Sequence, residues 1–272
     1  MVITIEDDFD LAAIAGSGQC FRWESPDVER WRIVHGGQCL YISRVGERTY
    51  ELDCDETSFE SVWRTYFDLE TCYGDVRKMI DPEADPFLFR AAETGKGIRI
   101  LRQDPWETAV SFIISQNRNI PAIKRSVEML CRIAGERRTD NRNAPFYTFP
   151  TPQAIVSVSQ EDLTRCRLGY REKYVMTAAQ AAAEGRFSPE RMETLSDGEL
   201  IEALCGLYGV GAKVASCIAL FGFHRLDAFP VDTWIRKALE NEYPDGFPAD
   251  RYRPFNGVYQ QYIFAYYREK TV

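Results

Sequence analysis

Lys213 and Asp232 are the two residues whose types and spacing best suit covalent chemistry. Lys213 follows Leu207-Tyr-Gly-Val-Gly211, and Asp232 stands 19 residues later in Phe229-Pro-Val-Asp232. A lysine amine attacks carbon only in its neutral form, which desolvation or nearby positive potential favours. A carboxylate can stabilise the positive charge that develops on the group under attack. The alternatives are a solvated surface lysine and an aspartate that only caps the helix beginning at Thr233.

The segment that positions Lys213 predicts two helices joined by a tight turn. An apolar stripe within residues 197–206 leads into Gly209-Val-Gly211, and Lys213 lies in the first turn of the next helix. Glycines permit positive φ angles and close backbone approach. The free amides of a helix N-terminus bind phosphate oxygens without a side chain. Gly209 and Gly211 therefore predict a phosphate-binding turn, with a plain helix connection as the alternative. Three apolar neighbours are candidates for desolvating the lysine: Val210, Val214 and Ile218.

The pattern of apolar residues predicts an α+β fold with a boundary near residue 95. Runs 31–35 and 39–43 flank Gly36-Gly37 and predict a β-hairpin, followed by a strand at 48–52 and a helix at 60–69. We expect residues 1–95 to form an antiparallel sheet domain and residues 96–272 to form a helical domain. Its helices are predicted at 106–116, 122–134, 173–184, 197–206, 212–223, 232–242 and 255–270. Loops are predicted around Pro145, Pro152 and Pro189.

Charge and composition argue against several classes of protein. The net charge is −8, yet residues 96–272 hold 24 Lys and Arg against 21 Asp and Glu, so a local basic face is compatible with the acidic total. The eight cysteines contain no CxxC pair and there are only two histidines, which argues against a zinc or iron–sulfur site. We therefore expect no metal and no cofactor. With no apolar run of ~20 residues and no export signal, we expect a cytoplasmic protein that contacts no membrane.

Several segments together resemble the 8-oxoguanine DNA glycosylase/lyase family of the helix-hairpin-helix glycosylases. They are residues 17–23 (SGQCFRW), 101–105 (LRQDP), 111–120 (SFIISQNRNI), 168–171 (LGYR), the glycine turn and 230–232 (PVD). The resemblance implies a monomeric, nucleoid-associated enzyme of base-excision repair that excises 8-oxoguanine from duplex DNA. It also implies that Lys213 forms a Schiff base with the sugar, that β-elimination then cleaves the strand, and that Asp232 is the electrostatic partner.

The same resemblance implies roles for further residues. Gly18 is expected to accept the N7–H of 8-oxoguanine through its carbonyl, while Cys217 and Phe264 pack on the two faces of the base. Gln260 is expected to read the Watson–Crick edge. On the DNA side, Asn117 and Tyr170 are expected to wedge the duplex, and Arg171 to read the opposite cytosine. As alternatives, Cys217 and Phe264 would serve as core residues, Asn117 as a helix cap and Tyr170 as a loop anchor.

Two positions depart from the family pattern. Ala122 stands where many relatives carry a second cytosine-reading arginine, so we expect weaker discrimination among opposite bases. Trp234 replaces a histidine that touches phosphate in some relatives. Three competing functions remain at this point: a glycosylase of the same fold for another damaged purine, a non-catalytic helix-hairpin-helix DNA-binding protein, and a small-molecule lyase.

Overall fold

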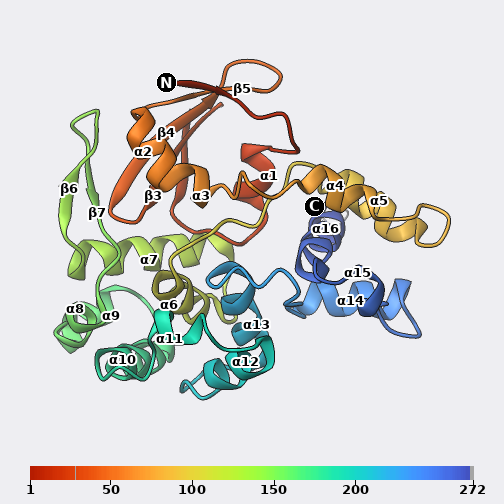
Figure 1. Cartoon of the computed structure of the whole chain (residues 1–272). Helices are drawn as coiled ribbons and strands as arrows, with labels where there is room; N and C mark the ends of the chain where they lie inside the picture. Colours follow the sequence, from red (N-terminus) through yellow and green to blue (C-terminus); the bar gives the residue numbers. More distant parts are fainter. Residues whose placement is uncertain (28, 270–272) are drawn as a thin grey trace.

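The computed structural model describes residues 1–27 and 29–269, and it has a sheet part and a helical part (Figure 1). The sheet is antiparallel and its strand order is β1-β5-β4-β3-β2. Helix α1 (Leu11–Gly16) and a helical segment pack against it. That segment runs through α2 (Glu56–Ser58), a π-helical turn (Phe59–Trp63) and α3 (Arg64–Tyr66). The strands are β1 (Val2–Thr4), β2 (Trp23–Asp27), β3 (Arg30–His35), β4 (Gln38–Arg44) and β5 (Thr49–Leu52).

The predicted hairpin is confirmed and its turn explains the register. His35 pairs with Gln38, so Gly36 and Gly37 are the two turn residues. Their φ angles are 55° and 76°, the left-handed conformation that a two-residue turn of this kind requires. This register places Ile33 and Leu40 opposite each other, both fully buried in the sheet core.

Helices make up most of the chain from residue 73 onward, which confirms the predicted fold class. All seven helices predicted in residues 96–272 are present, most with bounds shifted by one or two residues. The elements are α4 (Tyr73–Lys78), α5 (Pro86–Thr94), α6 (Pro105–Ser115), α7 (Ile120–Ala134), β6 (Arg137–Thr139), β7 (Pro145–Tyr147), α8 (Pro152–Val156), α9 (Gln160–Arg165), α10 (Arg171–Ala183), α11 (Pro189–Met192), α12 (Asp197–Cys205), α13 (Ala212–Phe221), α14 (Thr233–Glu242), α15 (Ala249–Tyr252) and α16 (Asn256–Glu269).

Three prolines that the sequence assigns to loops in fact begin short elements. Pro145 is the first residue of β7, Pro152 begins α8 and Pro189 begins α11. A proline suits the first position of a helix because its missing N–H has no partner there in any case. The loop prediction was therefore wrong at these positions, since a proline that ends one element can also start the next.

Two hydrophobic cores divide the chain. The sheet core extends to Trp63 and Phe67, while Tyr73, Val76 and Leu88 already belong to the helical core. Helices α4 and α5 thus pack with the helical part, although they precede residue 95. The domain boundary at that residue stays a prediction.

A buried carboxylate joins the two parts of the molecule. Asp68 follows α3, and its side chain accepts hydrogen bonds from Tyr73 Oη at 2.9 Å and from Arg102 Nε at 2.8 Å. His224 Nε2, which lies beyond α13, is 3.2 Å from the same carboxylate. Burial raises the pKa of Asp68, but the hydrogen bonds from His224 and Arg102 outweigh burial and hold it at about 2. Within the described residues, no helix is long and apolar enough to cross a membrane.

Candidate active site

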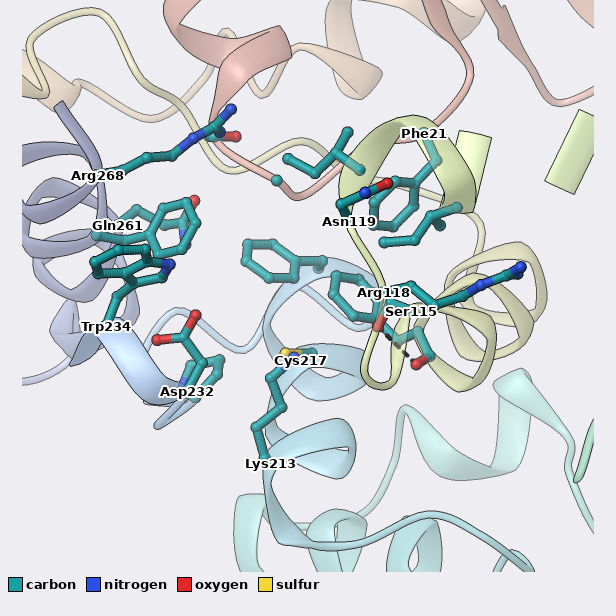
Figure 2. A pocket seen from close by; sticks show the side chains of 18 of the residues that line it. Phe21, Ser115, Arg118, Asn119, Lys213, Cys217, Asp232, Trp234, Gln261 and Arg268 are labelled. Atoms are coloured by element: carbon teal, nitrogen blue, oxygen red, sulfur yellow. Dashed lines mark hydrogen bonds between the residues drawn. The ribbon is translucent and has the colours of Figure 1, made fainter. Parts of the chain in front are cut away.

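A pocket of about 440 Å³ lies where α6, α13, α14 and α16 meet the loop before β2. Figure 2 shows Lys213 and Cys217 entering it from α13 and Asp232 entering from the start of α14. Six residues with a predicted catalytic or base-binding role line this pocket: Gly18, Lys213, Cys217, Asp232, Gln260 and Phe264. Four separate segments of the chain supply them, so the fold brings the predicted groups together.

Lys213 is the second residue of α13; the residue is exposed, and its side chain lines the pocket. Nζ is 5.7 Å from the ring centroid of Phe112, and Lys213 interacts electrostatically with the thiol of Cys217, one helical turn further on. Burial raises the pKa of Cys217 to about 11, although Lys213 acts in the opposite direction. Cys217 is therefore a neutral thiol at physiological pH, and it offers the pocket a small, polarisable surface.

Aromatic rings form the apolar wall beside Lys213. Phe112 stacks on Phe221 with ring centroids 5.4 Å apart, and Phe21 meets Phe112 edge-on at 5.5 Å. The three neighbours that were expected to desolvate the lysine do not line the pocket: Val210, Val214 and Ile218 are buried in the helical core. That expectation was wrong because these residues face the inside of the bundle, whereas Lys213 points across to α6.

Asp232 has a structural role and also faces the pocket. It is the N-cap of α14, where Oδ1 accepts the backbone N–H of Ile235 at 2.8 Å. Figure 2 shows its carboxylate at the pocket edge beside Trp234. Among the described residues no ion pair within 4.0 Å joins Lys213 to Asp232, and both line the cavity that lies between them. The capping alternative is thus correct, and it leaves the second carboxylate oxygen available.

Gly18 and Phe264 face each other across the pocket. Gly18 has a φ of 78°, and a Cβ at this position would stand 3.7 Å from the Phe264 ring. A side chain here would be strained by the backbone conformation and would occupy space next to the ring. Glycine therefore keeps one wall of the pocket flat and exposes the backbone there.

Gln260 is buried, and its amide is held at both ends. Nε2 donates to the Pro230 carbonyl at 3.0 Å, while Oε1 accepts from Gln261 Nε2 at 2.9 Å. Because a carbonyl only accepts, Pro230 determines which end of the Gln260 amide is the donor. The Gln261 Oε1 atom has no hydrogen-bond partner in the described structure and is buried. This pair gives the pocket a fixed polar edge.

The comparisons with known proteins agree with this geometry. The family model "8-oxoguanine DNA glycosylase, N-terminal domain" matches residues 1–109, and "HhH-GPD superfamily base excision DNA repair protein" matches residues 110–244. A probable N-glycosylase/DNA lyase of Methanothermobacter thermautotrophicus is 30% identical over 266 residues, covering 87% of this chain and 83% of that protein. The N-glycosylase/DNA lyase of Saccharomyces cerevisiae is 32% identical, covering 86% and 68%. The 8-oxoguanine glycosylase/lyase of Clostridium acetobutylicum, solved with double-stranded DNA that holds cytosine opposite 8-oxoguanine, superposes with a TM-score of 0.90. It is 33% identical and covers 100% of this chain and 99% of that one.

The chain belongs to the 8-oxoguanine DNA glycosylase family. It is thereby an enzyme of the class named N-glycosylase/DNA lyases.

Asn117 and Tyr170 lie together outside the pocket that Lys213 lines. Asn117 Nδ2 donates to Tyr170 Oη at 3.1 Å, and the Tyr170 side chain is 52% exposed. The caps of the two neighbouring helices are other residues, Gln116 at the end of α6 and Asn119 at the start of α7, while Asn117 has a left-handed φ of 52°. The pair projects from the surface as one unit, while its wedging role stays a prediction.

Arg171 lies beneath that pair. Its guanidinium is buried and stacks 4.2 Å from the centroid of the Tyr170 ring. It donates to the backbone carbonyls of Gln116 and Leu168, at 2.7 Å and 3.1 Å. In the structure Arg171 therefore holds the loop that carries Asn117, and its reading of an opposite cytosine stays a prediction.

The glycine turn between α12 and α13 uses its two glycines differently. Gly209 has a φ of 84°, and a Cβ there would stand 2.4 Å from the Tyr174 ring. Its carbonyl accepts from Gln116 Nε2 at 3.1 Å, which ties the turn to the loop before Asn117. Gly211, the N-cap of α13, has a φ of −98°, and a Cβ on it would meet open space. Gly209 is required by the fold, whereas Gly211 leaves the helix amides accessible from outside.

The sequence gives no signal for several residues that line the same pocket. Phe112 belongs to an apolar helix and has the pattern of a core residue, and Gln261 stands next to a predicted site residue with no signal of its own. Only the contact between α6 and α13 shows that Phe112 faces Lys213. Other lining residues without a predicted role are Phe21, Ser115, Arg118, Asn119 and Arg268.

Proposed function

We propose that this protein excises 8-oxoguanine from duplex DNA and then cleaves the strand through a Schiff base on Lys213. The observation that carries the proposal is the Lys213 side chain lining a pocket that also holds Cys217, Phe264 and Asp232. The names of the relatives support the substrate class. Because the lysine itself is the nucleophile, the reaction needs neither a metal nor a cofactor.

The proposed reaction has two covalent stages. Neutral Lys213 Nζ attacks C1′ of the deoxyribose, the bond from C1′ to N9 breaks, and the base leaves with a proton. The sugar ring opens to give an iminium between Nζ and C1′. Loss of a proton from C2′ then breaks the bond from C3′ to its oxygen, so the strand ends at that position. Asp232 stabilises the positive charge that develops on the sugar in the first stage.

The pocket suits a planar purine. A base between the Cys217 thiol and the Phe264 ring is desolvated on both faces, with Gly18 at one edge and Gln260 at another. The proposed acceptor for N7–H, which guanine lacks, is the Gly18 carbonyl. A hydrogen bond is worth about 1 kcal/mol net, but placing guanine's N7 lone pair against a buried carbonyl costs more.

The base must leave the helix because a stacked duplex hides C1′ from the amine. Extruding it costs a few kcal/mol. The exposed Asn117–Tyr170 pair is positioned to fill the gap that the base leaves. Ala122 offers no donor to an opposite base, so we expect weaker discrimination among opposite bases than a second arginine would give. The monomeric state and a location with the nucleoid in the cytoplasm stay predictions.

The covalent step is tested by borohydride trapping on 8-oxoguanine duplexes with each of the four opposite bases. We expect an adduct in all four lanes with the natural protein and none with Lys213→Gln, because the glutamine amide is not nucleophilic. The absence of an adduct on every duplex would remove the lyase assignment.

Asp232→Asn removes the negative charge but keeps a side chain that can cap α14. Asparagine caps as well as aspartate, so we expect thermal stability within about 0.5 kcal/mol of the natural protein. The rate of base release should fall by ~100-fold or more, because the electrostatic stabilisation of the sugar cation is lost. An unchanged rate would limit Asp232 to its structural role.

Two competing functions predict different results. A glycosylase of this fold for another damaged purine would release an alkylated base and leave 8-oxoguanine duplexes intact. A non-catalytic DNA-binding protein would release no base, with or without Lys213. Lys213 disfavours both, because neither hydrolytic excision nor plain DNA binding needs an amine in the pocket.

A further inference from the structure

A second cavity, of about 950 Å³, opens between the sheet, α7 and the end of α9. Figure 1 shows α7 lying between the sheet and helices α8, α9 and α10. We call this cavity the basic groove, because eight of its lining side chains are basic and two are acidic, in a chain whose net charge is −8. The basic residues are Arg22, Arg32, Arg118, Lys124, Arg125, Arg132, Arg165 and Arg167, and the acidic residues are Glu24 and Glu128.

Several of these cations have no carboxylate partner among the described residues. Arg118 donates to Ser126 Oγ and to the Arg167 carbonyl, and Lys124 donates to the Trp23 carbonyl. Arg125 and Arg167 are exposed and form no ion pair within the described ranges. Burial, together with the guanidinium groups of Arg171 and Arg125, lowers the pKa of Arg118. Like charges crowded in this way repel each other, and a bound polyanion relieves that repulsion.

The basic groove adjoins the pocket that Lys213 lines. Arg118 and Phe21 line both cavities. Arg118 directly follows Asn117, whose side chain bonds to Tyr170. Figure 2 shows the Arg118 side chain running away from Lys213. The loop at residues 117–118 therefore has the pocket on one side and the basic groove on the other.

We propose that the basic groove binds the sugar–phosphate backbone of the strand opposite the lesion. This inference rests on the proposed function, which places the damaged nucleotide in the Lys213 pocket. The other strand must then pass the loop on its far side, where the unpaired cations stand. The groove is much larger than a single base or phosphate needs. Its unpaired cations are spread over the loop before α7 (Arg118), α7 itself (Lys124 and Arg125) and the segment after α9 (Arg167). Attraction to phosphates does not depend on base identity, which is compatible with Ala122 at the rim.

The test is a double variant, Arg125→Ala with Arg167→Ala, whose affinity is measured over a range of salt concentrations. The ligands are a fluorescent 8-oxoguanine duplex and the same damaged strand without its complement. Each lost phosphate contact should reduce the slope of log K against log salt by about 0.9, so we expect a reduction of about 1.8 for the duplex. The single strand should bind as tightly to the variant as to the natural protein. Arg90→Ala, on α5 at the far end of the molecule, is the matched control and should change neither.

Two outcomes would overturn the proposal. An unchanged slope for the duplex would show that the groove contacts no phosphate. An equal loss for duplex and single strand would show that the groove binds the damaged strand instead. Failure of the proposed function would look different: the natural protein would form no borohydride adduct, while undamaged duplex and single strand could still be compared. The Arg90→Ala control should form the adduct at the natural rate, because Arg90 lines neither cavity.

Discussion

The orientation of the Gln260 amide determines which groups the polar edge of the pocket presents. Gln261 Nε2 donates to Gln260 Oε1, and Pro230 accepts from the other end of that amide. Gln261→Leu removes one of these two restraints and also the unpaired Oε1. Losing one hydrogen bond of about 1 kcal/mol should raise the enzyme concentration for half-maximal single-turnover excision by roughly fivefold. We expect the maximal rate to change little, because Lys213 and Asp232 stay in place. Gln260→Leu serves as the comparison and should cost at least as much, whereas an unchanged half-saturation in Gln261→Leu would show that Gln260 needs no such support.

In the turn between α12 and α13, we expect Gly209 to matter for folding and Gly211 for DNA binding. A methyl group at Gly209 would meet the Tyr174 ring and force a non-glycine residue to a φ of 84°. Gly209→Ala should therefore lower the free energy of unfolding by roughly 1–3 kcal/mol. Gly211→Ala should fold normally, since its Cβ would meet open space, but it should weaken DNA binding if phosphate approaches the α13 amides. Thermal unfolding and duplex affinity, measured on both variants, separate the two effects. Unchanged affinity in Gly211→Ala would mean that no phosphate comes close to this turn.

Asp68 links the sheet part to the helical part, and its charge contributes to the free energy of unfolding of the whole molecule. Its folded pKa of about 2 lies below the ordinary value of 3.8, so it contributes stability above the ordinary value and loses that contribution as the pH falls towards 2. Asp68→Asn should lower the free energy of unfolding at pH 7 by about 2 kcal/mol, and the difference should shrink below pH 4. Asparagine tolerates the left-handed backbone of this position, where φ is 50°. Chemical denaturation at pH 3, 5 and 7 provides the measurement, with the exposed Asp245→Asn as control. A difference that stayed constant with pH would rule out a role for the charge.

Much of the fold could be read from local pattern because its causes are local. Gly36-Gly37 between two β-rich runs specifies a tight hairpin, and the helix periods at 106–116 and 212–223 are long and strongly apolar. Short elements were missed where a proline starts a helix or strand, as at Pro145 and Pro152. A proline excludes the interior of an element but does not say what begins at its position.

The sequence by itself determined the chemical types, namely a lysine after a glycine turn, an aspartate that opens a helix, and the family to which these segments point. Only the tertiary structure decided that Phe112 faces Lys213 while Val214 is turned into the core. It also decided that Arg171 supports the Asn117 loop from below, and that scattered arginines collect into one groove. The physical reason is that periodicity shows which face of a helix is apolar but not which other helix that face meets. Contacts between residues about a hundred positions apart are decided only when the whole core packs.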